Sequence, residues 1–391
     1  MSSWYCRILF LLFLSFERYS CSYCSRNRTD IETAGGMICL YRMKTNFIPG
    51  IELSALFYQE IISPILDRNF PGLRHSAALI GAGSEVLGFD TEMSSDHDWG
   101  PRVKLFLEED GFAENARAIE AILKDNLPDQ LRNYPVRWSI TGPSGYRCVE
   151  LLTLRGFFLE YLRFDIHHEI KPADWLTFPE QKLRTVINGG IYRDDLDLQR
   201  SRERFRYYPH DVWLYLMSAQ WQRIGQEEHL MGRAGMAGDE VGSALIAARL
   251  VRDLMRLCFL MEKQYPPYPK WFGTAFARLS GVEELLPLLQ RVLSAPSWSE
   301  RQEFLVPAYE IVAAKHNALQ VTQVLPAKVS PFYDRPFLVI HGGRFAHALR
   351  EQIGDPLVKQ IAEKWLIGNV DQFSDSTDLL KKARSLRSLY E

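Results

Sequence analysis

Residues 79–107 have the sequence LIGAGSEVLGFDTEMSSDHDWGPRVKLFL, in which two strand signals flank a polar segment. Apolar residues predict a short strand at Ala77–Ile80, and a Gly-Ser turn follows at Gly83 and Ser84. A second strand is predicted at Arg102–Leu107, after a Trp-Gly-Pro sequence. A Gly-Ser turn beside a strand can bring backbone N–H groups and a hydroxyl close to a phosphate. The segment therefore predicts a phosphate-binding turn in a small sheet.

Two carboxylates lie in the polar segment, at Asp96 and Asp98. On an extended backbone, residues two positions apart point to the same face, whereas His97 between them points to the other face and is interpreted as structural. The paired carboxylates form an oxygen-rich site that suits Mg²⁺ or Mn²⁺ holding nucleotide phosphates. With the turn upstream they predict phosphoryl or nucleotidyl transfer. A solvated Asp-x-Asp loop without chemistry is the alternative.

Two other kinds of nucleotide site do not fit this sequence. A phosphate loop would need Gly-Lys followed by Ser or Thr after the glycines, and no such sequence follows them. A dinucleotide fingerprint would need the spacing G-x-G-x-x-G, which Gly81, Gly83 and Gly88 do not have. The Gly-Ser turn with the Asp pair remains the best interpretation.

The same residues resemble a known family. Gly83-Ser84 followed by Asp96-x-Asp98 resembles the signature of the polymerase-β-like nucleotidyltransferase superfamily, and GSEVLGFDTEMSSDHDWGPRV is similar to a domain of unknown function within it. The similarity continues through ADWLTFPEQKL (173–183), YYPHDVWLY (207–215), RLVRDLMRLCFLMEKQYPPYPKW (249–271) and NVDQFSDSTDLL (369–380). This resemblance implies a nucleotidyltransferase fold followed by a helical domain, as in aminoglycoside nucleotidyltransferases. It implies no particular acceptor.

Nucleotidyl transfer with two metal ions usually uses a third carboxylate on a neighbouring strand. Glu150 is the best placed, because it is charged within the apolar strand predicted at Cys148–Thr153, where a lone buried charge would be costly. Asp165 competes with it, although a helix predicted at Gly156–Tyr161 would carry Asp165 away from the sheet. A site without a third carboxylate is the remaining alternative.

Two basic residues are candidates for binding the triphosphate. If the backbone stays extended, Arg102 points to the same face as Asp96 and Asp98, because an even number of residues separates them. Lys104 is a weaker candidate on the same strand. Lys270 follows a proline-rich turn and can deliver a second cation. Its neighbour Trp271 offers either an aromatic face for a base or a side chain for the core.

The composition disfavours a long polynucleotide as the acceptor. The 391 residues are 47% hydrophobic and 12% aromatic, which is typical of a folded protein. The net charge of −2 offers no general basic surface, so a long nucleic acid is not expected as partner. A nucleoside triphosphate and an acceptor, either a small molecule or a protein, are the partners that we expect. Nothing in the sequence predicts the oligomeric state.

The first 42 residues differ from the rest. Ile8–Phe16 is an apolar run too short to span a membrane. It is interpreted either as the core of a signal peptide or, as we favour, as part of a leader ahead of a true start at Met37 or Met43. Beyond this segment the chain keeps only Cys148 and Cys258, which indicates no disulfide framework and favours a reducing cytoplasm. No membrane partner is expected.

The rest of the chain predicts an α+β fold with two domains. A small mixed-sheet nucleotidyltransferase domain is expected over residues 43–170, with a third strand at Val136–Thr141, and an α-helical bundle over 171–391. From Lys171 onward the pattern is helical. The predicted helices are Ile51–Asp67, Ala113–Asp125, Asp211–Glu227, Val241–Gln264, Gly281–Leu293 and Trp298–Leu319.

These observations lead to one hypothesis and two alternatives. The hypothesis is a metal-dependent nucleotidyltransferase that moves AMP from ATP, or another nucleotide, to a hydroxyl group. Asp96, Asp98 and Glu150 would hold the metal and perform catalysis, and Gly83, Ser84, Arg102 and Lys270 would bind the nucleotide. One alternative is a catalytically silent module of the same fold that binds a nucleotide or a partner. The other is an antitoxin-like enzyme that modifies a protein.

Overall fold

The structure is a computed structural model that describes residues 47–93, 99–136 and 148–391. The leader at 1–42 lies outside the described residues. Most of the strand predicted at Val136–Thr141 also lies outside them, and so do Asp96 and Asp98.

A four-stranded mixed sheet forms the first part of the fold. Its strands are β1 (His75–Leu79), β2 (Val103–Leu107), β5 (Val149–Thr153) and β6 (Gly190–Asp194), in the order β5-β2-β1-β6. β1 pairs antiparallel with β2 and β6, whereas β2 and β5 are parallel. The predicted strands at 77–80, 102–107 and 148–153 are thereby confirmed within two residues.

The fourth strand corrects one prediction. The chain is not helical throughout from Lys171 onward, because β6 at Gly190–Asp194 forms an edge of the sheet beside β1. One strand of the sheet therefore lies C-terminal to residue 170, where the boundary between the two domains was predicted. The boundary itself stays a prediction. β6 is half-exposed and lacks the apolar alternation of a strand, so its pairing with β1 determines its conformation.

Helices cover both faces of the sheet. On one face, α1 (Gly50–Phe57), a π-helical turn (Tyr58–Ile62) and α2 (Ser63–Asn69) form one continuous helical stretch, which confirms the helix predicted at Ile51–Asp67. It packs with α3 (Phe112–Asn126) against the alternate strand residues Ala77, Val103 and Leu105. On the other face, α4 (Leu154–Tyr161) packs Phe157 and Phe158 against Ala78 and Phe106. The two faces alternate residue by residue, as the period of a strand requires.

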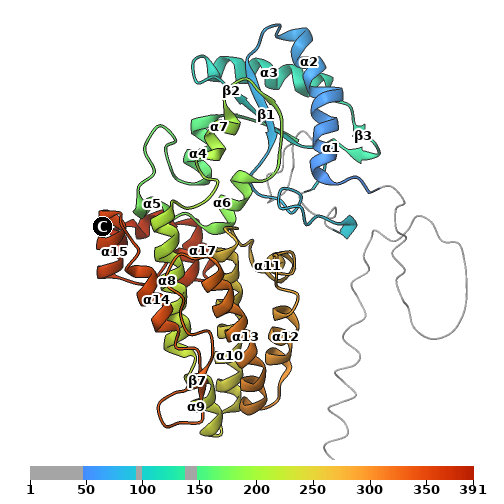
Figure 1. Ribbon diagram of the computed structural model, residues 1–391. Coiled ribbons are helices and arrows are strands. Elements are labelled where there is room, and N and C mark those ends of the chain that lie inside the picture. Colours follow the sequence, from blue (N-terminus) through green and yellow to red (C-terminus); the bar gives the residue numbers. More distant parts are fainter. Residues whose placement is uncertain (1–46, 94–98, 137–147) are drawn as a thin grey trace, which may run out of the picture. The chain divides into compact units, whose positions relative to one another are not determined.

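The second part is a bundle of helices, which confirms the predicted α+β class. Figure 1 shows α8 (His210–Glu227), α10 (Glu240–Met261) and α13 (Trp298–Ala318) side by side, and α10 packs against both of the others. The helix predicted at 281–293 begins later, as α12 (Leu285–Ser294), because Gly281 adopts a φ of +63° in the preceding turn. No helix among the described residues is long and apolar enough to cross a membrane.

Shorter elements connect and cover these helices. The remaining helices are α5 (Pro172–Trp175), α6 (Glu180–Ile187), α7 (Leu198–Glu203), α9 (Leu230–Met236), α11 (Pro269–Phe276), α14 (Gly342–Arg350), α15 (Pro356–Lys364), α16 (Val370–Phe373), α17 (Thr377–Lys381) and a 3₁₀ helix (Ala383–Tyr390). Two further strand pairs are β3 (Gln130–Leu131) with β4 (Tyr134–Pro135), and β7 (Ser330–Pro331) with β8 (Leu338–Val339).

Candidate active site

The Gly-Ser turn follows β1 directly and is tightly constrained. Gly81 and Gly83 have φ angles of +92° and +149°, a region that favours glycine. The Gly81 N–H donates to the Thr185 carbonyl of α6 at 3.0 Å. A Cβ atom on Gly83 would clash with the Arg102 guanidinium and would lie 2.7 Å from a carboxylate oxygen of Glu85. The turn therefore needs glycine for both conformation and space.

Arg102 supports this turn from within. Its guanidinium donates to the Ala82 carbonyl at 2.7 Å and forms an ion pair with Glu85, whose side chain is 2% exposed. The sequence prediction placed Arg102 on the triphosphate. The guanidinium holds the turn and a buried carboxylate, and its contact with a triphosphate stays a prediction.

A pocket of about 310 Å³ opens beside the turn. We call it the turn pocket. Its lining residues are Gly81, Ala82, Arg102, Lys104, Glu150, Leu152, Phe157, Glu160, Tyr161, Arg163 and Lys182. They come from the turn, from β2 and β5, from α4 and the residues after it, and from α6. Four of these side chains are cationic and two are carboxylates, so the described lining has a surplus of positive charge that suits an anionic ligand.

Glu150 lies in the turn pocket, on the strand where it was predicted. It stands opposite Lys104 in the parallel pairing of β5 with β2, and the two side chains form an ion pair. The Glu150 side chain is 43% exposed, so its carboxylate is accessible from the pocket. The Glu150 carboxylate can therefore lie in an apolar strand because Lys104 pairs with it and because it is partly exposed to solvent.

Asp165, the competing carboxylate, does not line the turn pocket. Its carboxylate binds Arg155 at 2.7 Å and accepts a hydrogen bond from the His167 N–H at 3.1 Å. The hydrogen bond from Arg155 holds the pKa of Asp165 below its usual range. These contacts give Asp165 a structural role.

The structure brings two further cations, Arg163 and Lys182, to the pocket. The Lys182 ammonium donates to the Tyr161 carbonyl at 2.7 Å, and its nitrogen lies 5.3 Å from the centre of the Tyr161 ring. Burial, and then the like charge of Arg163, lowers the pKa of Lys182. Sequence reasoning missed both residues, although Lys182 lies within the ADWLTFPEQKL similarity.

Lys270 does not line the turn pocket. It is exposed on α11, with its nitrogen 4.9 Å from the centre of the neighbouring Trp271 ring. Trp271 stacks on Phe89, at 5.4 Å between ring centres. This contact favours the core interpretation of Trp271, and nucleotide binding by Lys270 stays a prediction.

Asp90, before the Asp pair, and Trp99, after it, are joined by a hydrogen bond. The Asp90 carboxylate accepts hydrogen bonds from the Gly50 N–H at 2.7 Å and from the Trp99 indole N–H at 3.1 Å. Asp90 thus ties the start of α1 to the residue that follows Asp98. Among the described residues, no three His, Cys, Asp or Glu side chains gather as ligands of one metal ion. A metal site therefore remains a prediction that depends on Asp96 and Asp98.

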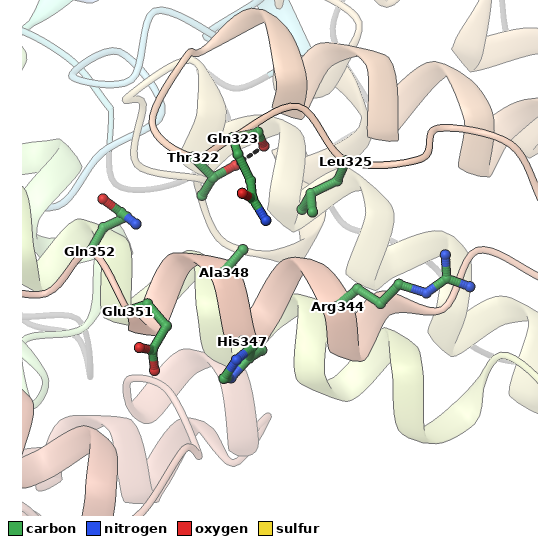
Figure 2. Close-up of a pocket in the computed structure, with 8 residues that line it drawn as sticks. All are labelled: Thr322, Gln323, Leu325, Arg344, His347, Ala348, Glu351 and Gln352. Carbon is green, nitrogen blue, oxygen red and sulfur yellow. Dashed lines mark hydrogen bonds between the residues drawn. The ribbon is translucent and has the colours of Figure 1, made fainter.

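Two other pockets lie elsewhere and share no lining residue with the turn pocket. One, of about 430 Å³, has Arg344 and His347 on α14 and Thr322 and Gln323 from the segment after α13 in its lining, as Figure 2 shows. Another, of about 780 Å³, is lined by the end of β2 and by parts of α4 and α7. Neither contains residues of the Gly-Ser turn.

Residues 175–272 match a family described as "Domain of unknown function (DUF4037)". The sequence matches no curated protein. Among solved structures, the chain is similar to a nucleotidyltransferase-like protein from Exiguobacterium sibiricum, with 14% identity over 86% of this chain and 89% of that one and a TM-score of 0.31. This likeness is coarse, so any case for nucleotidyl transfer must rest on the residues of the site.

Proposed function

We propose that this protein is a metal-dependent nucleotidyltransferase that transfers a nucleoside monophosphate, AMP from ATP, to a hydroxyl group of an acceptor. The turn pocket is the observation that carries the proposal. It combines a glycine turn, four cationic side chains and one carboxylate on a sheet strand, and it opens on the strand that follows Asp96 and Asp98. Its charge surplus suits a triphosphate.

In this proposal the protein contributes mainly position and charge. Backbone N–H groups near Gly83 and Ser84 would hold phosphate oxygens, and the Lys182 ammonium and the Arg163 guanidinium would neutralise their charge. Asp96 and Asp98 would hold Mg²⁺ or Mn²⁺, which when bound lowers the negative charge on the phosphates. The acceptor hydroxyl attacks the α-phosphorus in line, the bond to the bridging oxygen breaks, and pyrophosphate leaves.

Glu150 would accept the proton of the attacking hydroxyl. Because its carboxylate is paired with Lys104, this role requires the ion pair to loosen when the nucleotide binds. Lys104 lies in the same pocket, so its ammonium can turn to a phosphate oxygen and release the carboxylate.

The same ion pair favours the second candidate function. If Lys104 keeps Glu150 neutralised, the protein would bind a nucleotide without turnover, as a silent module. The two candidates differ only in whether label moves from nucleotide to acceptor.

The test is transfer from α-labelled ATP with Mg²⁺ or Mn²⁺ in a cell extract, together with nucleotide binding. We expect label on a small molecule or a protein, lost in Asp96→Ala/Asp98→Ala and reduced at least 100-fold in Glu150→Gln with binding retained. Asp165→Ala is the matched control, since it removes a carboxylate outside the pocket, and it should keep transfer. Binding without transfer would identify the silent module, and no binding would refute both candidates.

Two free cysteines, Cys148 and Cys258, are buried in the described part of the chain. They support the proposal that the reaction takes place in the reducing cytoplasm. The molecule that carries the label in the transfer experiment identifies the acceptor.

A further inference from the structure

The Gly-Ser turn is the first part of a closed loop that ends at Phe89. The Phe89 N–H donates to the Ser84 carbonyl at 3.0 Å, and the Gly88 N–H donates to the Glu85 carbonyl at 3.1 Å. A displacement of Phe89 would therefore move Ser84 directly. The position of the turn depends on what holds Phe89.

Phe89 is held by side chains that come from outside the sheet. Its ring is 3% exposed and stacks on Trp271 of α11, with the two ring planes 20° apart. The Arg278 guanidinium lies over the Phe89 ring at 4.4 Å, and it also donates to the Gly88 carbonyl at 3.1 Å. Arg278 thus binds both the ring and the backbone of the loop, as cation–π and hydrogen-bond partner. We call Phe89, Trp271 and Arg278 the loop clamp.

A second arginine lies beside the clamp. The Arg184 guanidinium on α6 is 5.7 Å from the Phe89 ring and donates to the Tyr265 carbonyl. Burial, and then the like charge of Arg278, lowers the pKa of Arg184. Two guanidinium groups near one ring are unfavourable by themselves, and the aromatic face and the backbone carbonyls offset that cost.

We propose that the loop clamp positions the Gly83–Ser84 turn, and that α11 and Arg278 of the helical part thereby set the affinity of the turn for a nucleotide. The second half of this inference rests on the proposed function. Trp271 and Arg278 are positioning residues, since they act through Phe89 and do not line the turn pocket.

Arg278 is the residue to change, because it is exposed and its replacement should leave the fold intact. Arg291→Ala is the matched control. Arg291 is also an exposed arginine over a phenylalanine, at 4.9 Å from the Phe304 ring, in a part of the bundle that does not touch the turn. Arg278→Lys tests rescue, since lysine keeps the charge and a donor.

Hydrogen exchange of the Gly88 and Phe89 amides tests the first half without a nucleotide. We expect Arg278→Ala to speed their exchange at least tenfold, Arg291→Ala to leave it unchanged and Arg278→Lys to restore part of the protection. Unchanged exchange in Arg278→Ala would overturn the inference. This result is independent of whether the protein transfers nucleotides.

Steady-state kinetics with ATP test the second half. We expect Arg278→Ala to raise KM five- to tenfold with kcat within twofold, whereas a merely structural defect would lower kcat by reducing the active fraction. Faster exchange with an unchanged KM would refute the effect on affinity. If the wild-type protein neither binds nor turns over ATP, the proposed function fails, and the inference about affinity fails with it. The hydrogen-exchange result still decides whether the loop clamp positions the turn.

Discussion

Arg256 in the bundle and Lys182 in the turn pocket are both basic side chains withdrawn from water, yet their surroundings have opposite effects on them. Burial acts to lower the pKa of Arg256, but the carboxylates of Glu180 and Asp371 outweigh it and hold that pKa above its usual value. For Lys182, burial and the neighbouring Arg163 both lower the pKa. In the bundle, carboxylates of the chain neutralise the charge of Arg256. In the pocket, the Lys182 ammonium has no carboxylate partner among the described residues.

This difference separates a structural network from the proposed binding site. In the network, Glu180 binds Arg256 at 2.7 Å, and the Asp371 carboxylate accepts from the Glu180 N–H at 2.9 Å. Asn369 adds a hydrogen bond to Glu180 at 3.1 Å. The buried Arg256 guanidinium is thus neutralised by carboxylates of the chain itself, so it needs no external ligand. In the pocket, the missing negative charge would come from a ligand.

The largest expected effect comes from breaking the closed network. Arg256→Ala leaves two buried carboxylates without their cation, so we expect the free energy of unfolding to fall by about 3–5 kcal/mol, measured by urea denaturation. Arg252→Ala is the control one helical turn away. Arg252 pairs with Asp375 on the surface, where a pair contributes about 0–1 kcal/mol. Equal losses in the two variants would contradict the distinction between buried and exposed pairs.

The second effect concerns the open pocket and is smaller in energy. Lys182→Met removes a hydrogen bond to a charged phosphate, about 1.5–3 kcal/mol, so we expect ATP affinity to fall roughly 10- to 100-fold. Lys182 has no internal carboxylate partner and donates only to the Tyr161 carbonyl among the contacts described, so its loss should lower the free energy of unfolding by at most about 1.5 kcal/mol. Isothermal titration measures the affinity for ATP, and thermal melting measures the stability of the variant.

Lys315→Met serves as the control for that prediction. Lys315 pairs with Glu262 at 3.2 Å inside the bundle, so its loss should lower stability without changing ATP affinity. A Lys182 variant that melts early and still binds ATP would reverse the assignment of roles.

The smallest effect is a dependence of stability on pH. Burial, and then the charge of Glu180, raises the pKa of Asp371 to about 7, above its usual value near 3.8. The folded state therefore binds a proton more tightly than the unfolded chain, and this group destabilises the fold increasingly as pH rises from about 4 to 7. We expect Asp371→Asn to reduce the loss of stability between pH 5.5 and 7.5 by on the order of 1 kcal/mol.

Denaturant titrations at several pH values measure this effect. Burial also raises the pKa of Glu228 to about 7. The contribution of Glu228 to the pH dependence of stability should therefore persist in Asp371→Asn. His316 acts in the opposite sense, since burial lowers its pKa to about 4 and stability is lost as pH falls below 6.5. An unchanged pH profile in Asp371→Asn would show that this carboxyl titrates alike in both states.

Much of the fold could be predicted because local patterns coincide with burial. All five residues of β1 are buried, so a short apolar run was sufficient to identify it. The helices α8 and α10 have apolar residues at helical spacing, and the bounds of α8, α10 and α13 agree with the predictions within three residues. Glu150 could be selected as a candidate because it is a charge within an apolar strand, and the pairing of β5 with β2 places it beside Lys104 in the turn pocket.

The parts that sequence reasoning missed depend on packing between distant segments. Lys182 is one of several charged residues on a short amphipathic helix, and only the packing of α6 against the turn brings it to the pocket. Arg163 reaches the same place from the loop after α4, with a φ of +56°. The contact of Arg278 with Gly88 joins residues 190 positions apart, which no local pattern can reveal.

β6 has a further consequence for how the chain can be divided. An expressed fragment that ends near residue 170 would lack this strand and would expose the backbone N–H and C=O groups along one side of β1. Exposed strand edges of this kind promote aggregation. The shortest autonomous fragment that retains the turn pocket must therefore extend at least through Asp194, and fragment boundaries should follow the sheet rather than the change in helical content.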